Sequence, residues 1–376
     1  MQKIIIMSTD PYIDLNYNNR CKFREVLNKL ITKGDKIVFT ANRESKKDLL
    51  TDINIDNENI RFYKRNELRI QLKNVIDNKN YFIVVGNRDA DLQLAASNKL
   101  FYIVPTWCDS LDILPQKYGI KVKDIEHLYK LINIIENQQS WYYRADLDEK
   151  TTILSLTSAN TWGFHSEEEL KMIESFRAYL KEGDSTHQMT LLYHFLASIS
   201  NNKEFRDIKD WGIMPSSGTE LNSDMNLMKE KARELMNGRK KEPIFLRHTA
   251  TWKSHKSWEN KLNRKPCDRH FDTIILNPYY KGKLKNRTVC IFDDYLTYGT
   301  TFETARNILI SENAKKIFFV SLGRFGKQYT MQNYEITGDV SKPGYAYKLL
   351  GTKEIYGKID KSAISEIEKL HNIINS

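Results

Sequence analysis

The sequence predicts an α/β protein made of two doubly wound domains with mainly parallel sheets. Short apolar runs alternate with amphipathic helical patterns along most of the chain, and the runs end in loops rich in polar residues, glycine and proline. The length of 376 residues is enough for about two or three domains with cores of their own. We place the first domain at residues 1–138, the second at 139–330 and a C-terminal extension at 331–376.

The first domain begins with a strand at 3–7, which runs into the loop Ser8 to Tyr12. An amphipathic helix follows, and Gly34 closes it at a position that favours a left-handed cap. Further apolar runs predict strands at 36–40, 81–85 and 100–104. Strands that alternate with helices in this way predict a small parallel sheet.

The pattern breaks between residues 136 and 150, and we predict a linker at 137–140. We expect Trp141, Tyr142 and Tyr143 to seat the two domains against each other, rather than to stack on nucleic-acid bases. A capping box of Ser166 and Glu169 predicts a helix over 166–183, and a second apolar helix is expected at 189–199. Both helices are expected to precede the main sheet of the second domain.

The second domain contains further apolar runs of strand length, at 211–214, 244–247, 273–276, 289–292 and 316–322. The first of them breaks into Pro215, Ser216, Ser217 and Gly218, a turn in which backbone N–H groups can surround an anion. A helix is expected at 222–236, and Gly323 to Gly326 could line a base-binding side. The extension 331–376 is predicted to be a hairpin followed by a helix.

The run 289–292 is followed directly by Asp293 and Asp294, which begin the stretch richest in candidate binding residues. A turn made of Thr297, Tyr298, Gly299, Thr300 and Thr301 then opens a helix. Backbone N–H groups and threonine hydroxyls at a helix N-terminus favour a phosphate group. The two carboxylates would repel a phosphate, so they require hydroxyl groups or a metal ion as partners. One ligand that satisfies both ends is a ribose 5-phosphate, although any strand–turn–helix with acidic residues in the turn would look similar.

This stretch resembles the binding motif for phosphoribosyl pyrophosphate (PRPP) of type I phosphoribosyltransferases. The resemblance implies that Asp293 and Asp294 are the catalytic pair, hold the ribose hydroxyls and contact Mg²⁺, and that residues 297–301 surround the 5′-phosphate. It also implies that Pro215 to Gly218 meet the pyrophosphate. Two positions depart from the family, since Tyr295 stands where an aliphatic residue is usual and Tyr298 where a small hydroxyl residue is usual.

A basic segment lies between the strands at 244–247 and 273–276. It is similar to the competence-associated branch of the same family, which implies a lid over the pyrophosphate with contributions from Arg247, Lys253 and Arg264. A solvated charged loop is the alternative for such a charge run.

The loops of the first domain resemble those of the haloacid dehalogenase-like superfamily. In the superfamily pattern, Ser8 replaces the nucleophilic Asp and Asn87 replaces a metal-binding Asp, whereas Asp10, Thr40 and Asp91 keep their expected types. Neutral Ser and Asn supply neither nucleophile nor metal ligand, so this domain is expected to lack phosphatase activity. The alternative is a generic Rossmann-like domain with no site.

Composition sets broad limits on partners and location. The net charge is +10, which suits phosphate-rich ligands, but no motif for nucleic-acid binding accompanies it. The four cysteines form no close pairs, so no zinc site or disulfide framework is expected. No apolar run is long enough for a membrane span, and we expect a cytoplasmic protein that does not bind membranes.

Two functions follow from these observations. The first is a phosphoribosyltransferase that binds PRPP or a related phosphorylated ribose with Mg²⁺ and transfers or cleaves at C1′. The second is a regulator that senses PRPP or a nucleotide without turning it over. A homodimer or a protein partner from the same operon is compatible with either, and the fusion of these two domain types resembles arrangements in bacterial stress-response and phage-defence clusters. The acceptor substrate is not readable from the sequence.

Overall fold

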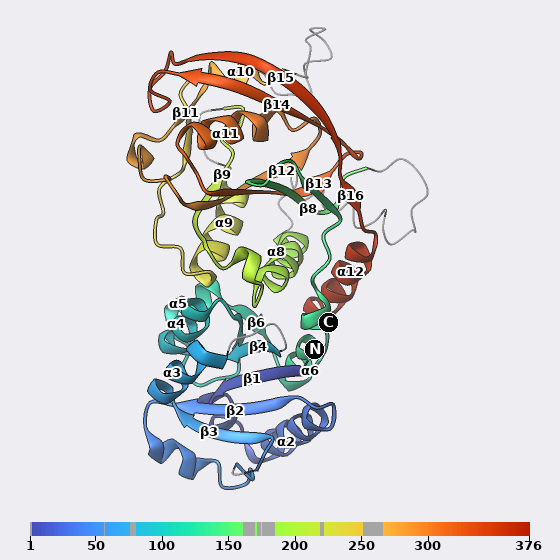
Figure 1. Cartoon of the computed structure of the whole chain (residues 1–376). Coiled ribbons are helices and arrows are strands. Elements are labelled where there is room, and N and C mark those ends of the chain that lie inside the picture. The colour runs from blue at the N-terminus through green and yellow to red at the C-terminus, as the bar shows by residue number, and fades with distance from the viewer. Residues whose placement is uncertain are drawn as a thin grey trace.

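The computed structural model describes residues 2–55, 57–75, 80–160, 170, 174, 185–218, 222–250 and 266–376. It confirms the α/β class. Two six-stranded sheets lie in two units that are stacked along the length of the molecule, and helices lie between and around them (Figure 1). The predicted helix at 166–183 lies outside the described residues, apart from two isolated positions.

The first sheet is parallel throughout, with strand order β3-β2-β1-β4-β5-β6. Both of its faces are covered by helices, which explains why β4 reads as a continuous apolar run rather than an alternating one. Helices α2 and α6 pack together, as do α3, α4 and α5. The strands are β1 (Gln2–Ser8), β2 (Lys36–Ala41), β3 (Ile60–Lys64), β4 (Asn80–Val85), β5 (Phe101–Pro105) and β6 (Ile120–Val122). The helices are α1 (Asp10–Ile13), α2 (Tyr17–Thr32), α3 (Arg65–Val75), α4 (Asp89–Asn98), α5 (Ile113–Tyr118) and α6 (Ile125–Ile134), with short 3₁₀ turns η1 (Glu44–Leu49) and η2 (Ile135–Asn137).

The second sheet is mixed, with strand order β16-β7-β8-β13-β12-β9. The four strands β8, β13, β12 and β9 are parallel, whereas β7 and β16 add an antiparallel edge. Its strands are β7 (Tyr143–Asp146), β8 (Thr151–Ser158), β9 (Ile208–Ile213), β12 (Thr288–Leu296), β13 (Lys316–Arg324) and β16 (Lys358–Ile359). The helices packed on it are α8 (Ser185–Ile199), α9 (Ser223–Leu235), α11 (Thr300–Ser311) and α12 (Ser362–Ile374).

Strand β8 corrects the sequence analysis, which expected two helices to precede the main sheet of the second domain. All eight of its residues are buried, although five of them are Thr or Ser. Two of the hydroxyls find partners on neighbouring strands, since Ser155 Oγ lies 2.6 Å from Ser321 Oγ on β13 and Thr152 Oγ1 donates to Asp146 on β7 at 2.8 Å. The buried hydroxyls of Thr151 and Thr157 have no hydrogen-bond partner in the described chain. A buried strand can therefore carry a polar sequence when its neighbour supplies the hydrogen bonds.

The aromatic cluster at 141–143 also differs from the prediction. Trp141 packs against Phe195 and Phe205, with ring centroids 5.9 and 5.7 Å apart, and all three residues belong to the second unit. Tyr143 is buried in β7. These side chains therefore build the core of the second unit rather than the contact between the two units.

Two antiparallel ribbons complete the second unit. The runs at 244–247 and 273–276 form β10 (Phe245–Arg247) and β11 (Ile274–Leu276), which pair only with each other in the described chain and do not join the main sheet. The predicted C-terminal hairpin is present as β14 (Gln328–Thr337) and β15 (Ala346–Tyr356), and it lies over α10 (Asp268–Phe271) and α11 (Figure 1). Short 3₁₀ turns occur at η3 (Lys203–Phe205) and η5 (Pro278–Tyr280).

The two units touch through α9 against α4 and α5, and through α12 against α6. Asn201 makes the most specific contact. Its side-chain amide donates to Phe82 O and accepts from Phe82 N, both at 3.1 Å. Strand β5 begins to pair with β4 only at Ile83, so the Asn201 side chain takes the place of a strand at the preceding residue.

Candidate functional site

A cavity of about 560 Å³ opens at the carboxyl edge of the second sheet. Strand β12 pairs with β9 only as far as Phe292, but it pairs with β13 as far as Leu296. The last residues of β12 therefore have one side free of a neighbouring strand, and the cavity lies there. It is lined by Met214, Pro215, Ser216, Ser217, Asn222, Met225, Arg247, Arg269, His270, Phe325 and residues 293–301.

The cavity brings together most of the residues predicted for the site. Four separate segments meet in it, which are the acidic pair, the threonine-rich turn, the loop after β9 and Arg247. Gly218 does not line the cavity, and Lys253 and Arg264 lie outside the described residues. The strand before the acidic pair is longer than predicted, because Asp293 and Asp294 are themselves part of β12.

The two carboxylates lie side by side and half-buried at the floor of the cavity. Asp293 accepts hydrogen bonds from the Thr301 hydroxyl and the Asp294 N–H, both at 3.0 Å. Asp294 accepts from the Tyr295 N–H at 2.6 Å. Burial, and then the negative charge of Asp294, raise the pKa of Asp293 well above its ordinary value. A bound cation or a set of hydroxyl donors would therefore be stabilised at this position.

The turn before α11 is shaped by Gly299. This residue has a φ of +78°, and a Cβ atom on it would lie 2.2 Å from the ring of Tyr329. Thr300 is buried with its hydroxyl 3.4 Å from His270 Nε2, whereas Thr297 and Tyr298 are exposed. The turn opens a helix of 12 residues, so its N–H groups and the helix dipole favour an anion at this end of the cavity.

The loop after β9 is held by Arg247, which ends β10. Arg247 Nε donates to Ser216 O at 2.6 Å, and Nη1 donates to the Thr273 hydroxyl. Burial lowers the pKa of Arg247 to about 10, partly countered by the charge of Asp293, so the guanidinium stays positive at neutral pH. Arg247 thus fixes the loop and places a positive charge opposite the acidic pair.

Arg269 and His270 belonged to the predicted basic segment, but the sequence analysis did not assign them to the site. His270 is buried, and burial together with the charges of Arg269 and Arg247 lowers its pKa to about 3. The imidazole is therefore neutral under ordinary conditions. Tyr295 and Phe325 form an aromatic wall, with ring centroids 5.8 Å apart. Phe325 belongs to the stretch Gly323 to Gly326, which was expected to line a base-binding side, and Tyr295 comes to lie beside it because β12 and β13 extend beyond β9.

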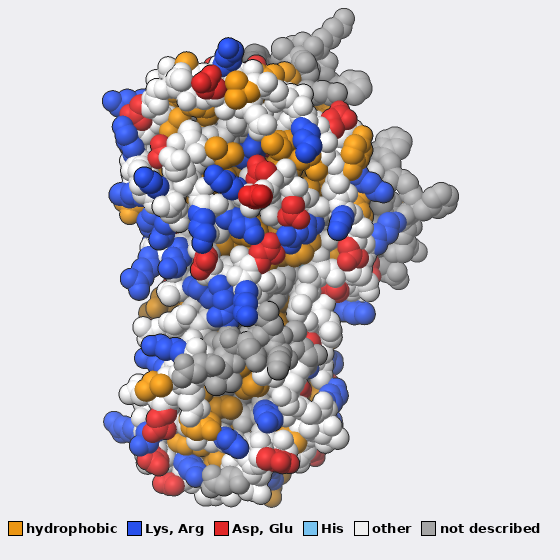
Figure 2. All heavy atoms as spheres, viewed as in Figure 1, with side chains coloured by type: hydrophobic (Ala, Val, Ile, Leu, Met, Phe, Trp, Pro, Cys, Tyr) orange, Lys and Arg blue, Asp and Glu red, His pale blue; other side chains and the backbone are white. Residues whose placement is uncertain are grey.

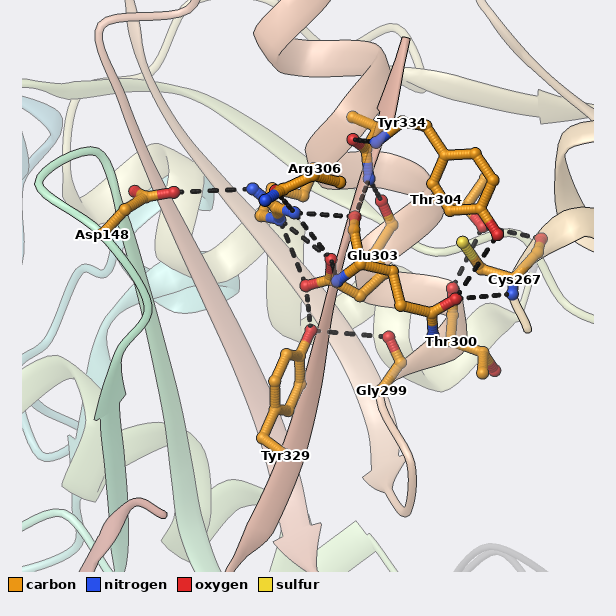
Figure 3. Close-up of polar contacts among 12 residues, drawn as sticks. Asp148, Cys267, Gly299, Thr300, Glu303, Thr304, Arg306, Tyr329 and Tyr334 are labelled. Atoms are coloured by element: carbon orange, nitrogen blue, oxygen red, sulfur yellow. Dashed lines mark hydrogen bonds and ion pairs between the residues drawn. The ribbon is translucent and has the colours of Figure 1, made fainter. Parts of the chain in front are cut away.

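A buried polar network supports the turn from behind (Figure 3). Glu303 on α11 pairs with Arg306 at 2.8 Å, and it accepts hydrogen bonds from the Tyr329 hydroxyl and the Gln332 N–H, both at 2.7 Å. The Tyr329 hydroxyl also lies 3.5 Å from Gly299 O. Strand β14 is thereby locked to the helix whose first turn forms the cavity.

A second cavity of about 500 Å³ lies at the carboxyl edge of the first sheet. Of the five positions predicted there, Ser8 and Asp10 line it. Asp10 is paired with Arg88 at 3.1 Å and Lys46 at 3.3 Å, and although burial alone would raise its pKa, these partners lower it.

The other three predicted positions of the first unit are buried and absent from the cavity lining. Asp91 is engaged by Arg65 and by the N–H groups of Asn87 and Arg88. Thr40 is at the end of β2. The charges of this cavity are thus balanced internally.

Neither a metal-binding cluster nor a membrane-spanning helix is found in the described part of the chain. Among the described residues, no group of three or more His, Cys, Asp or Glu side chains could hold a metal ion by itself. No helix in the described part of the chain has the length and apolar character needed to span a membrane.

Comparison of the chain with protein-family models, with curated proteins and with solved structures gave no match.

Proposed function

We propose that the second unit binds PRPP or a related ribose 5-phosphate with Mg²⁺, and that it acts as a phosphoribosyltransferase-like enzyme at C1′ of the ribose. The observation that supports this most is the meeting of an acidic pair, an anion-binding turn and a second turn held by Arg247 in one cavity of about 560 Å³. A cavity of that size accommodates a sugar phosphate or a nucleotide.

In this proposal, each part of the ligand has its own partner. The 5′-phosphate is bound by the first turn of α11, from Thr297 to Thr301. The ribose hydroxyls donate to the carboxylates of Asp293 and Asp294. The pyrophosphate is bound by the loop Pro215 to Ser217, and the charges of Arg247 and Arg269 offset its negative charge.

The residues present fit a Mg²⁺ ion that shares its coordination with the ligand. Asp293 and Asp294 supply carboxylate oxygens, which are ligands that Mg²⁺ prefers, and ligand oxygens and water would complete the shell. Burial, and then the negative charge of Asp294, raise the pKa of Asp293, and a bound cation would offset both effects. When bound, Mg²⁺ would supply charge neutralisation of the pyrophosphate.

The chemistry is then mainly positioning and electrostatics. The bond from C1′ to the pyrophosphate oxygen breaks, and its electron pair leaves with the pyrophosphate. An acceptor with a lone pair forms the new bond to C1′, with no covalent link to the protein. The carboxylates hold the ribose while positive charge develops at C1′, and the arginines hold the leaving group.

A second candidate is a sensor that binds the same ligand without turnover. It is favoured by Tyr298, whose side chain is 46% exposed at the mouth of the cavity where a bulky group could restrict an acceptor. The internally balanced cavity of the first unit also favours it. If that unit is haloacid dehalogenase-like, its site has Asp10 paired with Arg88 and Lys46 in place of a metal.

Calorimetry with PRPP and Mg²⁺ tests both candidates. Wild type should bind, and the double variant Asp293→Asn, Asp294→Asn should not. A matched control is Glu335→Gln with Glu354→Gln on the exposed hairpin, which removes the same charge. Absence of binding by wild type, or equal binding by the double variant, would refute the ligand assignment.

A pyrophosphate-release assay over a panel of bases then separates the candidates. Release with any acceptor supports the transferase, and tight binding with no release supports the sensor.

A further inference from the structure

A group of basic segments lies at the edge of the second sheet opposite the candidate cavity. Residues 203–210, 281–287 and 315–316 lead into the N-terminal ends of β9, β12 and β13, and 239–242 follow α9. We call these four segments the basic edge. β12 begins at Thr288, and Asp293 is its first residue in the cavity lining, so a separation of roughly 17 Å follows at about 3.3 Å per residue. The basic edge is therefore distinct from the site described above.

Direct contacts join the four segments into one surface. Asp210 pairs with Lys240 at 2.9 Å and with Arg287 at 2.8 Å. The Lys315 N–H donates to Arg287 O at 2.8 Å, and Lys316 pairs with Glu204 at 3.5 Å. Figure 2 shows Lys and Arg side chains gathered across the waist of the molecule, where α9 and the following loop lie in Figure 1.

The charge of this surface is far from balanced. The basic edge holds twelve Lys and Arg residues against four Asp and Glu residues, an excess of eight positive charges in a chain with a net charge of +10. Glu312 and Asp339, which contact Gly282 and Lys281, reduce the excess to six. Within the described chain, no ion pair is found for Lys203, Lys209, Arg239, Lys241, Lys283 or Lys285, and all six are exposed.

The positive charge of the basic edge also affects Lys99, a neighbouring residue of the first unit. Lys99 is buried against the second unit, where its Nζ donates to Met236 O. Burial, and then the positive charges of Lys209 and Arg206, together lower its pKa to about 8. The basic edge thus continues toward the junction of the two units. Its excess of positive charge favours a negatively charged partner.

The exposed side chains indicate which polyanion fits. Among the exposed large apolar residues of the described chain, only Tyr279 lies at this surface, and Lys283 Nζ lies 3.7 Å from its ring centroid. A protein interface needs an apolar centre, and membrane attachment is strengthened by apolar insertion. Single-stranded nucleic acid is bound on several aromatic platforms. None of these features accompanies the charges.

We propose that the basic edge binds the phosphate backbone of a nucleic-acid duplex, DNA or RNA, without reading its sequence. Lys and Arg side chains at the ends of three strands contact successive phosphates. The cavity lies at the opposite edge of the sheet, so it stays open to small ligands when the protein is bound to a duplex. This binding does not depend on the function proposed for the cavity.

Fluorescence anisotropy of the full chain with labelled duplexes of about 24 base pairs tests the proposal across about 50 to 200 mM salt. Wild type should bind unrelated DNA sequences equally. The double variant Lys283→Glu, Lys285→Glu should bind at least tenfold more weakly, with a smaller salt dependence. The matched control is Lys348→Glu with Lys353→Glu on the exposed strand β15, which should change affinity less than threefold.

Three results would overturn the proposal. They are an absence of salt-dependent duplex binding, an equal loss in the two double variants, which would show only a net-charge effect, and tighter binding to single strands or to phosphatidylserine vesicles than to duplex. Comparison of DNA with RNA duplexes shows which of the two nucleic acids the basic edge binds more tightly. Unchanged PRPP calorimetry of Lys283→Glu, Lys285→Glu would show that the cavity and the basic edge act separately.

Discussion

Asp293 shows how a site residue can lower the stability of the protein that carries it. Its carboxylate is half-buried beside that of Asp294, and its pKa is raised well above the ordinary value by burial and by this neighbour. In the unfolded chain, the pKa of Asp293 returns to its ordinary value. The folded state therefore binds a proton more readily, and its stability falls as the pH rises through the folded pKa.

We expect Asp293→Asn to stabilise the ligand-free protein at pH 7 by about 0.5–2 kcal/mol, because the amide carries no charge. The gain should shrink as the pH is lowered through the raised pKa of folded Asp293 and should be lost below its ordinary pKa of about 4, because wild type is then protonated in both states. Thermal unfolding between these pH values measures the difference. Equal melting temperatures at pH 7, or a gap that widens on acidification, would contradict the electrostatic account.

Tyr298 is the departure from the motif whose consequence is simplest to measure. Its side chain is 46% exposed, so it can point away from the turn and leave the backbone N–H groups free. We expect Tyr298→Thr to change PRPP affinity by less than about 1 kcal/mol, as surface substitutions usually do. Calorimetry measures this directly. A tenfold gain in affinity would indicate that the phenol occupies ligand space and would shift weight to the sensor.

At the scale of elements, apolar runs predicted most of the strands, including β1, β2, β4, β12 and β13. The prediction failed at β8, because the partner Ser155 finds on β13 cannot be read from a polar sequence. It located β10 and β11 correctly, but it did not show that they pair as a separate ribbon, because that pairing depends on tertiary contacts.

Some residues of the candidate site could likewise be predicted from the local sequence, and others could not. The acidic pair, the threonine-rich turn and the loop after β9 have local signatures. The places of His270, Tyr295 and Phe325 depend on which strand edges are left open, and this is a property of the assembled sheet.

The contact between the turn and the hairpin gives a prediction with an internal control. Gly299 and Gly326 have similar φ values, +78° and +72°, but a Cβ on Gly299 would lie 2.2 Å from the Tyr329 ring, whereas one on Gly326 would meet nothing within 4 Å. Gly326→Ala should cost only the backbone strain, about 1–2 kcal/mol. Gly299→Ala should cost clearly more and should abolish PRPP binding. Chemical denaturation compares the two, and similar losses would show that Tyr329 does not restrain the turn.

For the whole molecule, Asn201 is the contact that most directly couples the two units. Asn201→Ala removes both hydrogen bonds to the Phe82 backbone and leaves two buried groups without partners, each worth about 1–3 kcal/mol. Asn313→Ala is the matched control, since both residues have a left-handed backbone, with φ values of 62° and 57°. Hydrogen exchange at residues 80–85 should accelerate only in Asn201→Ala. Equal exchange in the two variants would remove Asn201 from this role.

The two units are also expected to differ in chemistry. In the first, Asp10 is already paired with Arg88 and Lys46, and Ser8 replaces a carboxylate nucleophile. We expect the full chain to show no Mg²⁺-dependent hydrolysis of p-nitrophenyl phosphate. Turnover that disappears on Asp10→Asn would prove this wrong, whereas turnover that persists in the variant would point to a contaminant.

The second sheet joins strands that are made far apart in time. β8 ends at residue 158 and waits for β13, which begins at residue 316. At about 5–20 residues per second this delay is roughly 10–30 seconds on the ribosome, and during this time β8 has no parallel strand to pair with. Tyr329 and β16 are made later still. The residues that line the cavity extend to Phe325, so the cavity and its support by Tyr329 are completed only after residue 329 has emerged, and until then the open strand edges of the nascent second unit favour aggregation.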